Sequence, residues 1–161
     1  MMKIKIFTVG GTIDKVYFDA KSTYQVGDPR VTEILKSANI TFEYECESLL
    51  YKDSLDMDDQ DRQLIFDKLQ ADTHQYIVIT HGTDTMVETA RKLQAISDKV
   101  IVLTGAMEPA RFISSDAVFN VGCAIGAVQC LPPGIYIAMN GRIFHADKVR
   151  KNVELNRFEE T

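Results

Sequence analysis

Two short segments of the sequence place glycine beside side chains that can do chemistry. The first is Gly10-Gly11-Thr12, and the second is His81-Gly82-Thr83-Asp84. Paired glycines allow a sharp turn and bring backbone N–H groups close to a ligand. Hydroxyl, carboxylate and imidazole groups are those that enzymes use as nucleophiles, acids and bases. The two segments are therefore the candidate catalytic segments of the chain.

Each segment also has a structural interpretation. A glycine turn after a first strand is common in proteins without catalytic activity. Thr83 or Asp84 would also suit the cap of a following helix, because a carboxylate is stabilised at the positive end of the helix dipole. The spacing of Gly10 and Gly11 fits neither a Walker A loop nor GxGxxG, so nucleotide binding gains little support. The residues alone leave the structural interpretation open.

The elements that position these segments follow from the hydrophobic pattern. Apolar runs of strand length, rich in β-branched residues, occur at Ile4 to Val9, Tyr76 to Thr80, Val100 to Thr104 and Ile135 to Met139. Such runs are typical of parallel strands buried on both faces. We predict a further strand over Phe42 to Cys46. Strands that alternate with helices predict a three-layer α/β fold: a mostly parallel, doubly wound sheet with helices on both faces.

Helical spacing of apolar residues separates the predicted strands. The residues concerned are Val31, Ile34 and Leu35; Leu64, Ile65 and Leu69; Met86, Ala90 and Leu93; and Val118, Val121, Ile125 and Val128. Asp28-Pro29 predicts a cap and a first helical residue, and Ser114-Ser115-Asp116 offers caps for the last helix. Ligands of open α/β sheets bind outside the carboxyl ends of the strands, where both glycine segments lie. We therefore expect the chemistry at that edge.

Further loops follow the other predicted strands. Lys52 to Met57 and Thr104 to Pro109 carry small or hydroxylic residues. Asp14 to Gly27 has mixed polarity and little periodicity, which is typical of a functional lid. Lys148 to Thr161 is charged and predicts an ordered tail or an interface arm. No repeat or linker divides the chain, so one domain is expected.

Neither the acids nor the cysteines predict a metal site. The acids near the second loop are Asp53, Asp56, Asp58, Asp59 and Asp61, but the glycine that an EF-hand loop requires is absent. The three cysteines lack CxxC spacing, which argues against both zinc and a disulfide framework. We interpret Cys46, Cys123 and Cys130 as core thiols.

Composition narrows the class of partner. The chain has 161 residues, of which 45% are apolar and 25% charged, as in an ordinary globular protein. A net charge of −5 argues against general affinity for nucleic acid or anionic lipid. Residues 1–7 are too short an apolar run for a signal peptide, and no stretch approaches the roughly 18 apolar residues of a membrane span. We expect no nucleic-acid or membrane partner and a cytoplasmic location.

The segments together resemble the asparaginase family. Gly10-Gly11-Thr12-Ile13 and Ile79 to Met86 correspond to its two signature motifs. Further matches, in the family's order, are Tyr24-Gln25-Val26-Gly27, Ser54-Leu55-Asp56-Met57, Gly105-Ala106-Met107 with Pro109, and Val149-Arg150-Lys151. The matches cover nearly the whole chain but only the amino-terminal domain of the usual two-domain enzyme. The resemblance implies one such domain over residues 1–161.

The resemblance implies an amidohydrolase that releases ammonia from L-asparagine without a metal or cofactor. Thr12 would be the nucleophile that forms an acyl-enzyme, with Tyr24 on the lid beside it. Thr83, Asp84 and Lys151 would form the second catalytic group. A lysine serves as a base where burial lowers its pKa, which would assign the base to Lys151 and its orientation to Asp84. Backbone N–H groups at either glycine turn are candidate oxyanion donors.

The resemblance also implies a pocket for the amino acid. Ser54 and Asp84 would bind the substrate's carboxylate and amino group, and the other expected pocket residues are Gly11, Leu55, Gly82, Thr83 and Ala106. Val9 stands where the family usually has threonine, and Leu55 where a polar residue often helps to hold the amino group. These departures predict altered affinity or specificity.

Three other interpretations of single residues stay open without the family. Tyr24 would simply pack, Ser54 would cap a helix from Met57, and Lys151 would be one more solvated charge. The alternative function is an amino-acid-binding or regulatory domain that keeps the pocket without turnover. In two-domain relatives a neighbouring subunit completes the pocket, so we expect this chain to be a homo-oligomer.

Overall fold

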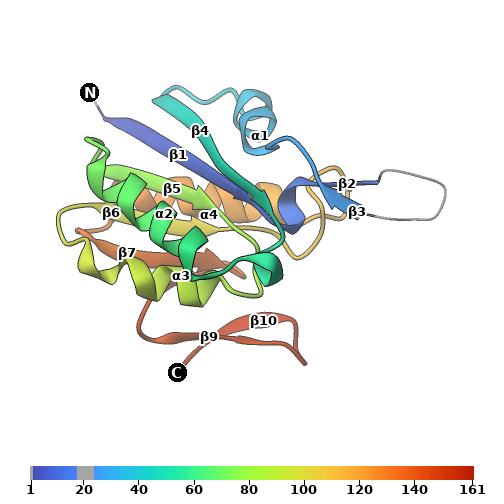
Figure 1. Cartoon of the computed structure of the whole chain (residues 1–161). Helices are drawn as coiled ribbons and strands as arrows, with labels where there is room; N and C mark the ends of the chain where they lie inside the picture. The colour runs from blue at the N-terminus through green and yellow to red at the C-terminus, as the bar shows by residue number, and fades with distance from the viewer. Residues whose placement is uncertain (1, 18–23) are drawn as a thin grey trace.

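A computed structural model of the chain describes residues 2–17 and 24–161. Its central sheet has six strands in the order β4-β1-β5-β6-β7-β8 (Figure 1). The strands are β1 (Lys3–Gly10), β4 (Glu43–Lys52), β5 (Tyr76–Thr80), β6 (Val100–Thr104), β7 (Gly134–Met139) and β8 (Arg142–His145). The first five are parallel, and only β8 runs antiparallel, beside β7.

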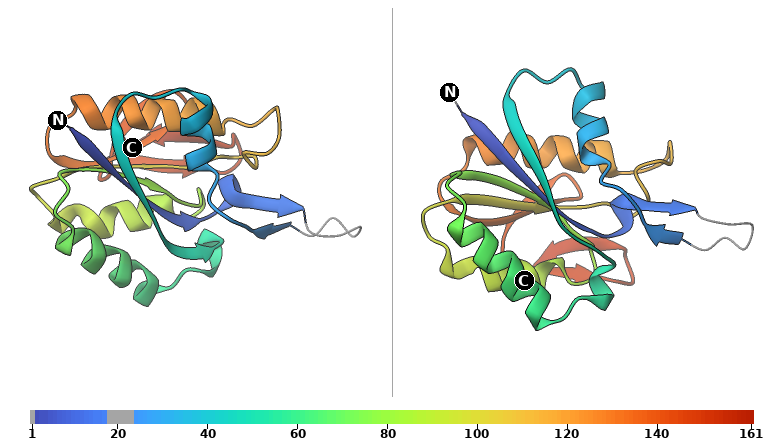
Figure 2. Two further views of the ribbon diagram at one scale, coloured as in Figure 1. Left: turned by 90° about the horizontal axis from the view of Figure 1, so that it is seen from above. Right: turned by 45° about the horizontal axis from the view of Figure 1, so that its top comes forward.

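Helices cover both faces of this sheet. They are α1 (Val31–Ser37), α2 (Asp59–Ala71), α3 (Met86–Lys92) and α4 (Ala117–Cys130). Figure 2 shows α1 and α4 on one face and α2 and α3 on the other. The predicted three-layer, mostly parallel α/β fold is therefore confirmed. No helix within the described residues is long and apolar enough to span a membrane.

Two hydrophobic layers hold the helices on the sheet. Successive residues of a strand point to opposite faces, so Ile6 packs toward α1 and α4 while Phe7 packs toward α2 and α3. Both side chains are fully buried, and burial of one such side chain stabilises the fold by roughly 1.5–3 kcal/mol. The continuous apolar runs of the sequence exist because the strands have helices on both sides.

The order of the strands creates a switch point between β1 and β5. The chain leaves β1 for β4 on one side and then returns through α2 to β5 on the other side. Loops that follow β1 and β5 therefore leave the sheet in different directions, and ligands of open α/β sheets bind in the crevice at such a point. Both glycine segments lie there, because one follows β1 and the other follows β5.

Two hairpins extend from the sheet. The first pairs β2 (Lys15–Tyr17) with β3 (Tyr24–Val26), and residues 18–23 of the expected lid lie outside the described residues. The second pairs β9 (Val149–Asn152) with β10 (Arg157–Glu160). It lies beyond α3 in Figure 1, and its Val149 and Phe158 are buried in the α3-side core. The charged carboxyl-terminal segment is thus ordered and packed.

The strand predicted over Phe42 to Cys46 is longer in the structure and lies at the edge of the sheet. Glu43, Glu45 and Glu47 alternate in a strand that extends to Lys52 rather than ending at Cys46. The glutamates are accommodated because β4 is an edge strand with lysines beside it, as in the 3.0 Å contact of Lys5 Nζ with Glu47. An edge strand does not need a continuous apolar run, so hydrophobicity underestimated its length.

Several helix starts also differ from the predicted ones. The helix expected at Pro29 begins at Val31, and a helix expected from Met57 begins at Asp59. Its cap is Asp58, whose carboxylate accepts the Asp61 N–H at 2.9 Å, and not Ser54. Three residues expected in the core are exposed: Leu64, Val118 and Cys130. Periodicity located these helices but did not fix their ends or the width of their buried faces.

Candidate functional site

Gly10 and Gly11 form a turn that other residues would not adopt. Their φ angles are 100° and 91°, in the region that favours glycine. A Cβ on Gly10 would lie 2.5 Å from the carbonyl oxygen of Lys52, and a Cβ on Gly11 would lie 2.5 Å from Cα of Gly82. The turn after β1 is thus in backbone contact with the turn after β5. This contact brings Thr12 and Thr83, each the next residue along, to one crevice.

The loop after β4 closes on the same turn. A Cβ on Gly82 would lie 2.7 Å from the Ser54 side chain, which is 1% exposed. The hydroxyl of Thr85 donates to the carbonyl oxygen of Ser54 at 2.9 Å, and the Thr85 N–H donates to Ser54 Oγ at 3.2 Å. Three loops that are distant in sequence therefore stack on one another at the carboxyl end of the sheet.

The loop after β6 supports this stack from beneath. A Cβ on Gly105 would lie 2.2 Å from the carbonyl oxygen of His81, so the two backbones are in contact. Asn120 donates to the Gly105 carbonyl at 2.9 Å, and the Asp116 carboxylate accepts the Met107 N–H at 3.0 Å. Asp116 is thereby used to hold the loop, while Ser115 Oγ accepts the N–H of the first helical residue of α4. Ala106, in the same loop, is buried.

Lys151 joins Thr83 and Asp84 in a polar cluster. Its Nζ donates to Thr83 Oγ1 at 2.8 Å and to Asp84 Oδ1 at 2.7 Å. The lysine side chain is 12% exposed and that of Asp84 is 41% exposed. The interpretation of Lys151 as a solvated charge is therefore wrong. The capping interpretation of Thr83 and Asp84 is wrong as well, because α3 begins after Thr85 with no side-chain cap.

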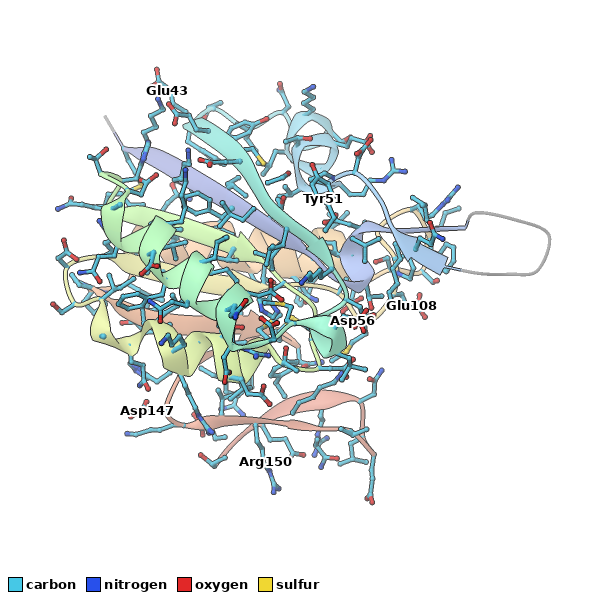
Figure 3. The ribbon with its side chains drawn as sticks, in the orientation of Figure 1. Glu43, Tyr51, Asp56, Glu108, Asp147 and Arg150 are labelled. Carbon is cyan, nitrogen blue, oxygen red and sulfur yellow. The ribbon has the colours of Figure 1, made fainter. Side chains whose placement is uncertain are left out.

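The β9–β10 hairpin aims the lysine at the crevice. Phe158 lies opposite Lys151, and its N–H donates to Asn140 Oδ1 at 2.8 Å instead of facing β9. Phe158 and Lys151 are thus a non-hydrogen-bonded pair, the kind whose side chains lie close together, and Phe158 is buried. Figure 3 shows the neighbouring Arg150 pointing away from the sheet, as alternation along a strand requires.

His81 is a structural member of the turn. Its Nδ1 lies 2.7 Å from the carbonyl oxygen of Gly82, and its Nε2 lies 2.7 Å from the hydroxyl of Thr89. A carbonyl only accepts, so Nδ1 carries the proton and Nε2 accepts from the threonine. Complete burial lowers the pKa of His81 to about 4. The imidazole is therefore neutral and has both nitrogens occupied, which leaves it no free group for catalysis.

Asp53 orders the loop that carries Ser54 and Leu55. Its Oδ1 accepts the Leu55 N–H at 3.1 Å, and its Oδ2 lies 2.7 Å from Nζ of Lys15 in β2. Burial opposes the charge of Asp53, but its hydrogen bonds and the positive charges of Lys15 and Lys151 lower its pKa. Leu55 is 71% exposed and offers no polar group. Asp53 and Lys15 were not predicted, because their role depends on contacts between distant loops.

One expected oxyanion donor is excluded. The Gly11 N–H donates to the Lys52 carbonyl at 2.9 Å, so it is occupied and helps to hold the turn. Within residues 2–17 and 24–161, no hydrogen-bond acceptor faces the N–H of Gly82 or Thr83. Of the candidate donors, those at the second turn are available.

Two further expected residues lie at the amino-terminal side of the crevice. Thr12 is the first residue of a short 3-10 turn, Thr12–Asp14, and is partly exposed. Tyr24 begins β3, where its backbone lies opposite Tyr17, but its side chain is outside what the structure describes. The structure thus brings the Thr12 turn, Gly82, Thr83, Asp84, Ser54 and Lys151 to one edge of the sheet.

An open α/β sheet with a cluster of polar, hydroxyl-bearing side chains at its switch point is typical of a small-molecule-binding or enzymatic domain. Comparison with known proteins identifies the protein family. The family model described as "Asparaginase, N-terminal" matches residues 3–158. The chain belongs to the asparaginase family.

Individual relatives agree with the family match. The chain is 30% identical to glutaminase-asparaginase of Acinetobacter glutaminasificans, an alignment that covers 95% of this chain and 50% of the relative. The solved thermostable L-asparaginase of Thermococcus kodakarensis superposes with a TM-score of 0.83 at 30% identity, over 99% of this chain and 51% of that one. A probable cytoplasmic L-asparaginase from Campylobacter jejuni gives a TM-score of 0.78 at 30% identity, over 99% and 52%. The chain spans about half the length of these proteins.

Proposed function

We propose that this chain hydrolyses the side-chain amide of L-asparagine to aspartate and ammonia through an acyl-enzyme on Thr12. The observation that carries the proposal is the cluster of Lys151 with Thr83 and Asp84, held beside the Thr12 turn by the contact of Gly11 with Gly82. A domain that only binds an amino acid has no need of a nucleophilic hydroxyl next to a sequestered amine.

In the first half of the proposed reaction, Thr12 Oγ1 attacks the amide carbon. Lys151, oriented by its 2.7 Å hydrogen bond to Asp84, is the group that transfers protons in this reaction. The same amine also donates a hydrogen bond to Thr83 Oγ1. The C–N bond then breaks, the leaving nitrogen takes a proton and departs as ammonia, and an ester to Thr12 remains. Tyr24, on the hairpin after the Thr12 turn, is the expected companion of the nucleophile.

Water completes the reaction. It attacks the ester carbon, the bond to Thr12 Oγ1 breaks, and the threonine recovers its proton, so aspartate is released and the enzyme is unchanged. Both half-reactions pass through a tetrahedral oxyanion. The N–H groups of Gly82 and Thr83 are the proposed donors to it, because fixed donors need no reorganisation during the reaction.

Ser54 and Asp84 are the proposed contacts for the substrate's carboxylate and ammonium groups. Ser54 Oγ already accepts the Thr85 N–H at 3.2 Å, so its own proton is free to point at a carboxylate. Gly11, Gly82 and Ala106 provide close-packed walls. Leu55 contributes no polar contact to the ammonium group, which makes Asp84 the main support for it.

The proposal includes a second copy of the chain and a cytoplasmic location. The crevice is bordered by polar groups that a closed active site shields from water, and a symmetric partner would provide the cover. The location follows the name of the Campylobacter jejuni relative. Light scattering at working concentration tests the assembly, and a strictly monomeric mass contradicts it.

Ammonia release by the purified chain tests the activity. L-asparagine, D-asparagine and L-glutamine are compared, with Thr12→Ala as the inactive control and Thr12→Ser as the conservative one. We expect release from L-asparagine that disappears in Thr12→Ala and survives in part in Thr12→Ser. Saturable binding of L-asparagine without any Thr12-dependent release would instead establish an amino-acid-binding domain.

A further inference from the structure

Asp14 is a buried carboxyl group that the proposed reaction does not use. It ends the short turn that begins with Thr12, and it is 1% exposed. Its Oδ1 accepts the Arg30 N–H at 2.9 Å. Its Oδ2 is buried and has no hydrogen-bond partner in the described part of the chain. A carboxyl group in this condition requires an explanation, because desolvation of an incompletely bonded charge is costly.

The position of Asp14 links the Thr12 turn to the first hairpin. β2 begins at the next residue, Lys15, and Gly27 follows the end of β3. The carbonyl oxygen of Asp14 accepts the Gly27 N–H at 2.8 Å, while the carboxylate holds the Arg30 N–H. Asp14, which directly precedes the hairpin, therefore binds two N–H groups of the segment that follows it. The hairpin carries Tyr24, and the turn carries Thr12.

In the part of the chain that the structure describes, the titratable groups that interact with this carboxyl are Arg30 and Cys46. Arg30, in the segment before α1, has its guanidinium paired with Glu33 at 2.8 Å, and its Nε is buried without a partner in the described residues. Cys46, on β4, is the other neighbour. Burial, and then the charge of Asp14, raise the pKa of this thiol. Of these three groups, the Asp14 carboxyl is the one whose pKa lies near neutrality, because burial raises it.

We propose that Asp14 is a positioning residue that couples the Thr12 turn to the β2–β3 hairpin, and that ionisation of its carboxyl group sets the strength of this coupling. An ionised carboxylate accepts a stronger hydrogen bond from the Arg30 N–H than a neutral acid does. Burial raises the pKa of Asp14 to about 7, against the opposing pull of the Arg30 N–H and guanidinium. Both forms are therefore populated at neutral pH. The catalytic meaning of this coupling rests on the proposed function.

Amide NMR of the whole chain tests the coupling without relying on activity. Spectra are recorded from about pH 5 to about pH 9, a range that spans the raised pKa of the Asp14 carboxyl. We expect the amide signals of Thr12, Gly27 and Arg30 to move together with a midpoint near 7. Asp14→Asn should abolish the shared step, whereas Cys46→Ser should keep it, since the thiol is not its source.

Three results overturn the inference: no shared step, a midpoint near the ordinary aspartate value, or the same step in Asp14→Asn. If Asp14→Asn does not fold, the carbon-13 signal of the Asp14 carboxyl in the unsubstituted chain decides the midpoint by itself. The pH dependence of kcat/KM for L-asparagine should show the same step in the unsubstituted chain only.

The two proposals fail separately. A shared NMR step without ammonia release leaves the coupling in place and rejects the proposed activity. Thr12-dependent ammonia release without a shared NMR step supports the activity and rejects the role of Asp14.

Discussion

Gly11 and Gly82 touch backbone to backbone, so that a Cβ built on the first would lie 2.5 Å from Cα and N of the second. This contact sets the distance between the turns that carry Thr12 and Thr83. It also explains the glycine at position 11, since a side chain there would meet Gly82, whereas a Cβ on Gly82 would meet Ser54.

A side chain at Gly11 should therefore damage both the fold and the site. Gly11→Ala places a Cβ at a φ of 91° and against a neighbouring backbone, which costs at least about 1–3 kcal/mol of stability. Gly126→Ala is the matched control, because its Cβ meets nothing within 4 Å in α4. The control should gain roughly 0.5–1 kcal/mol. Urea unfolding measures both, and equal stabilities of the two variants would contradict the contact.

Loss of the amine at Lys151 should abolish turnover while the fold persists. Lys151→Met keeps the length of the stem but removes the donor to Thr83 and Asp84, and should lower kcat by about 10²- to 10⁴-fold. Arg150→Met is the control, because that side chain is 63% exposed and pairs with Glu159 on the neighbouring strand. Activity that survives in Lys151→Met, or falls equally in both variants, would count against the assigned role.

The stability of the fold should depend on the Thr89 hydroxyl that donates to the buried imidazole of His81. Thr89→Val removes the donor to Nε2 and leaves a buried acceptor unsatisfied, which should cost about 1–3 kcal/mol. Thr89→Ser keeps the donor and should recover most of this loss. Thermal unfolding of the two variants separates the hydrogen bond from packing, and a Thr89→Val variant as stable as Thr89→Ser would contradict the hydrogen bond.

Asp14 should make stability fall as pH rises. Its folded pKa of about 7 lies above the ordinary value of 3.8, so the folded chain holds a proton between these values that the unfolded chain has released. The contribution of this group is therefore fully present below about pH 4 and is lost as pH rises to about 7. Asp14→Asn removes the dependence, and its advantage should grow to a few kcal/mol by about pH 8. A constant difference in Tm between the two proteins across pH would contradict this.

His81 acts in the opposite direction, and the comparison removes its effect. Its folded pKa of about 4 lies below the ordinary value of 6.5, so the fold loses stability as pH falls through this range. This contribution is common to the unsubstituted chain and Asp14→Asn. The difference between the two proteins therefore isolates the carboxyl group.

The sheet and the two glycine turns could be predicted because their signals are local. A buried parallel strand needs a continuous apolar run, and a turn against another backbone needs glycine. The family resemblance supplied the role of Lys151. Its physical setting was not predictable, because its contact with Thr83 spans 68 residues and depends on the pairing of β9 with β10.

Where prediction failed, tertiary contacts had replaced local ones. Of the caps offered by Ser114-Ser115-Asp116, Ser115 accepts the Ala117 N–H but Asp116 holds the Met107 N–H instead. The residue before α1 is held by Asp14 rather than by Asp28. The Gly11 N–H, an expected oxyanion donor, is held by Lys52. A polar group without an obvious partner nearby in the sequence is often hydrogen-bonded in the fold to a residue far away in the sequence.

The central claim is that Thr12 forms the acyl-enzyme. Rapid acid quenching of the chain with L-asparagine, followed by mass spectrometry of its peptides, tests this directly. We predict an aspartyl ester on the peptide that contains Thr12, absent in Thr12→Ala and accumulated when hydrolysis of the ester is slow. An ester on Thr83, or ammonia release in which Thr12→Ala turns over as fast as the unsubstituted chain, would contradict the account.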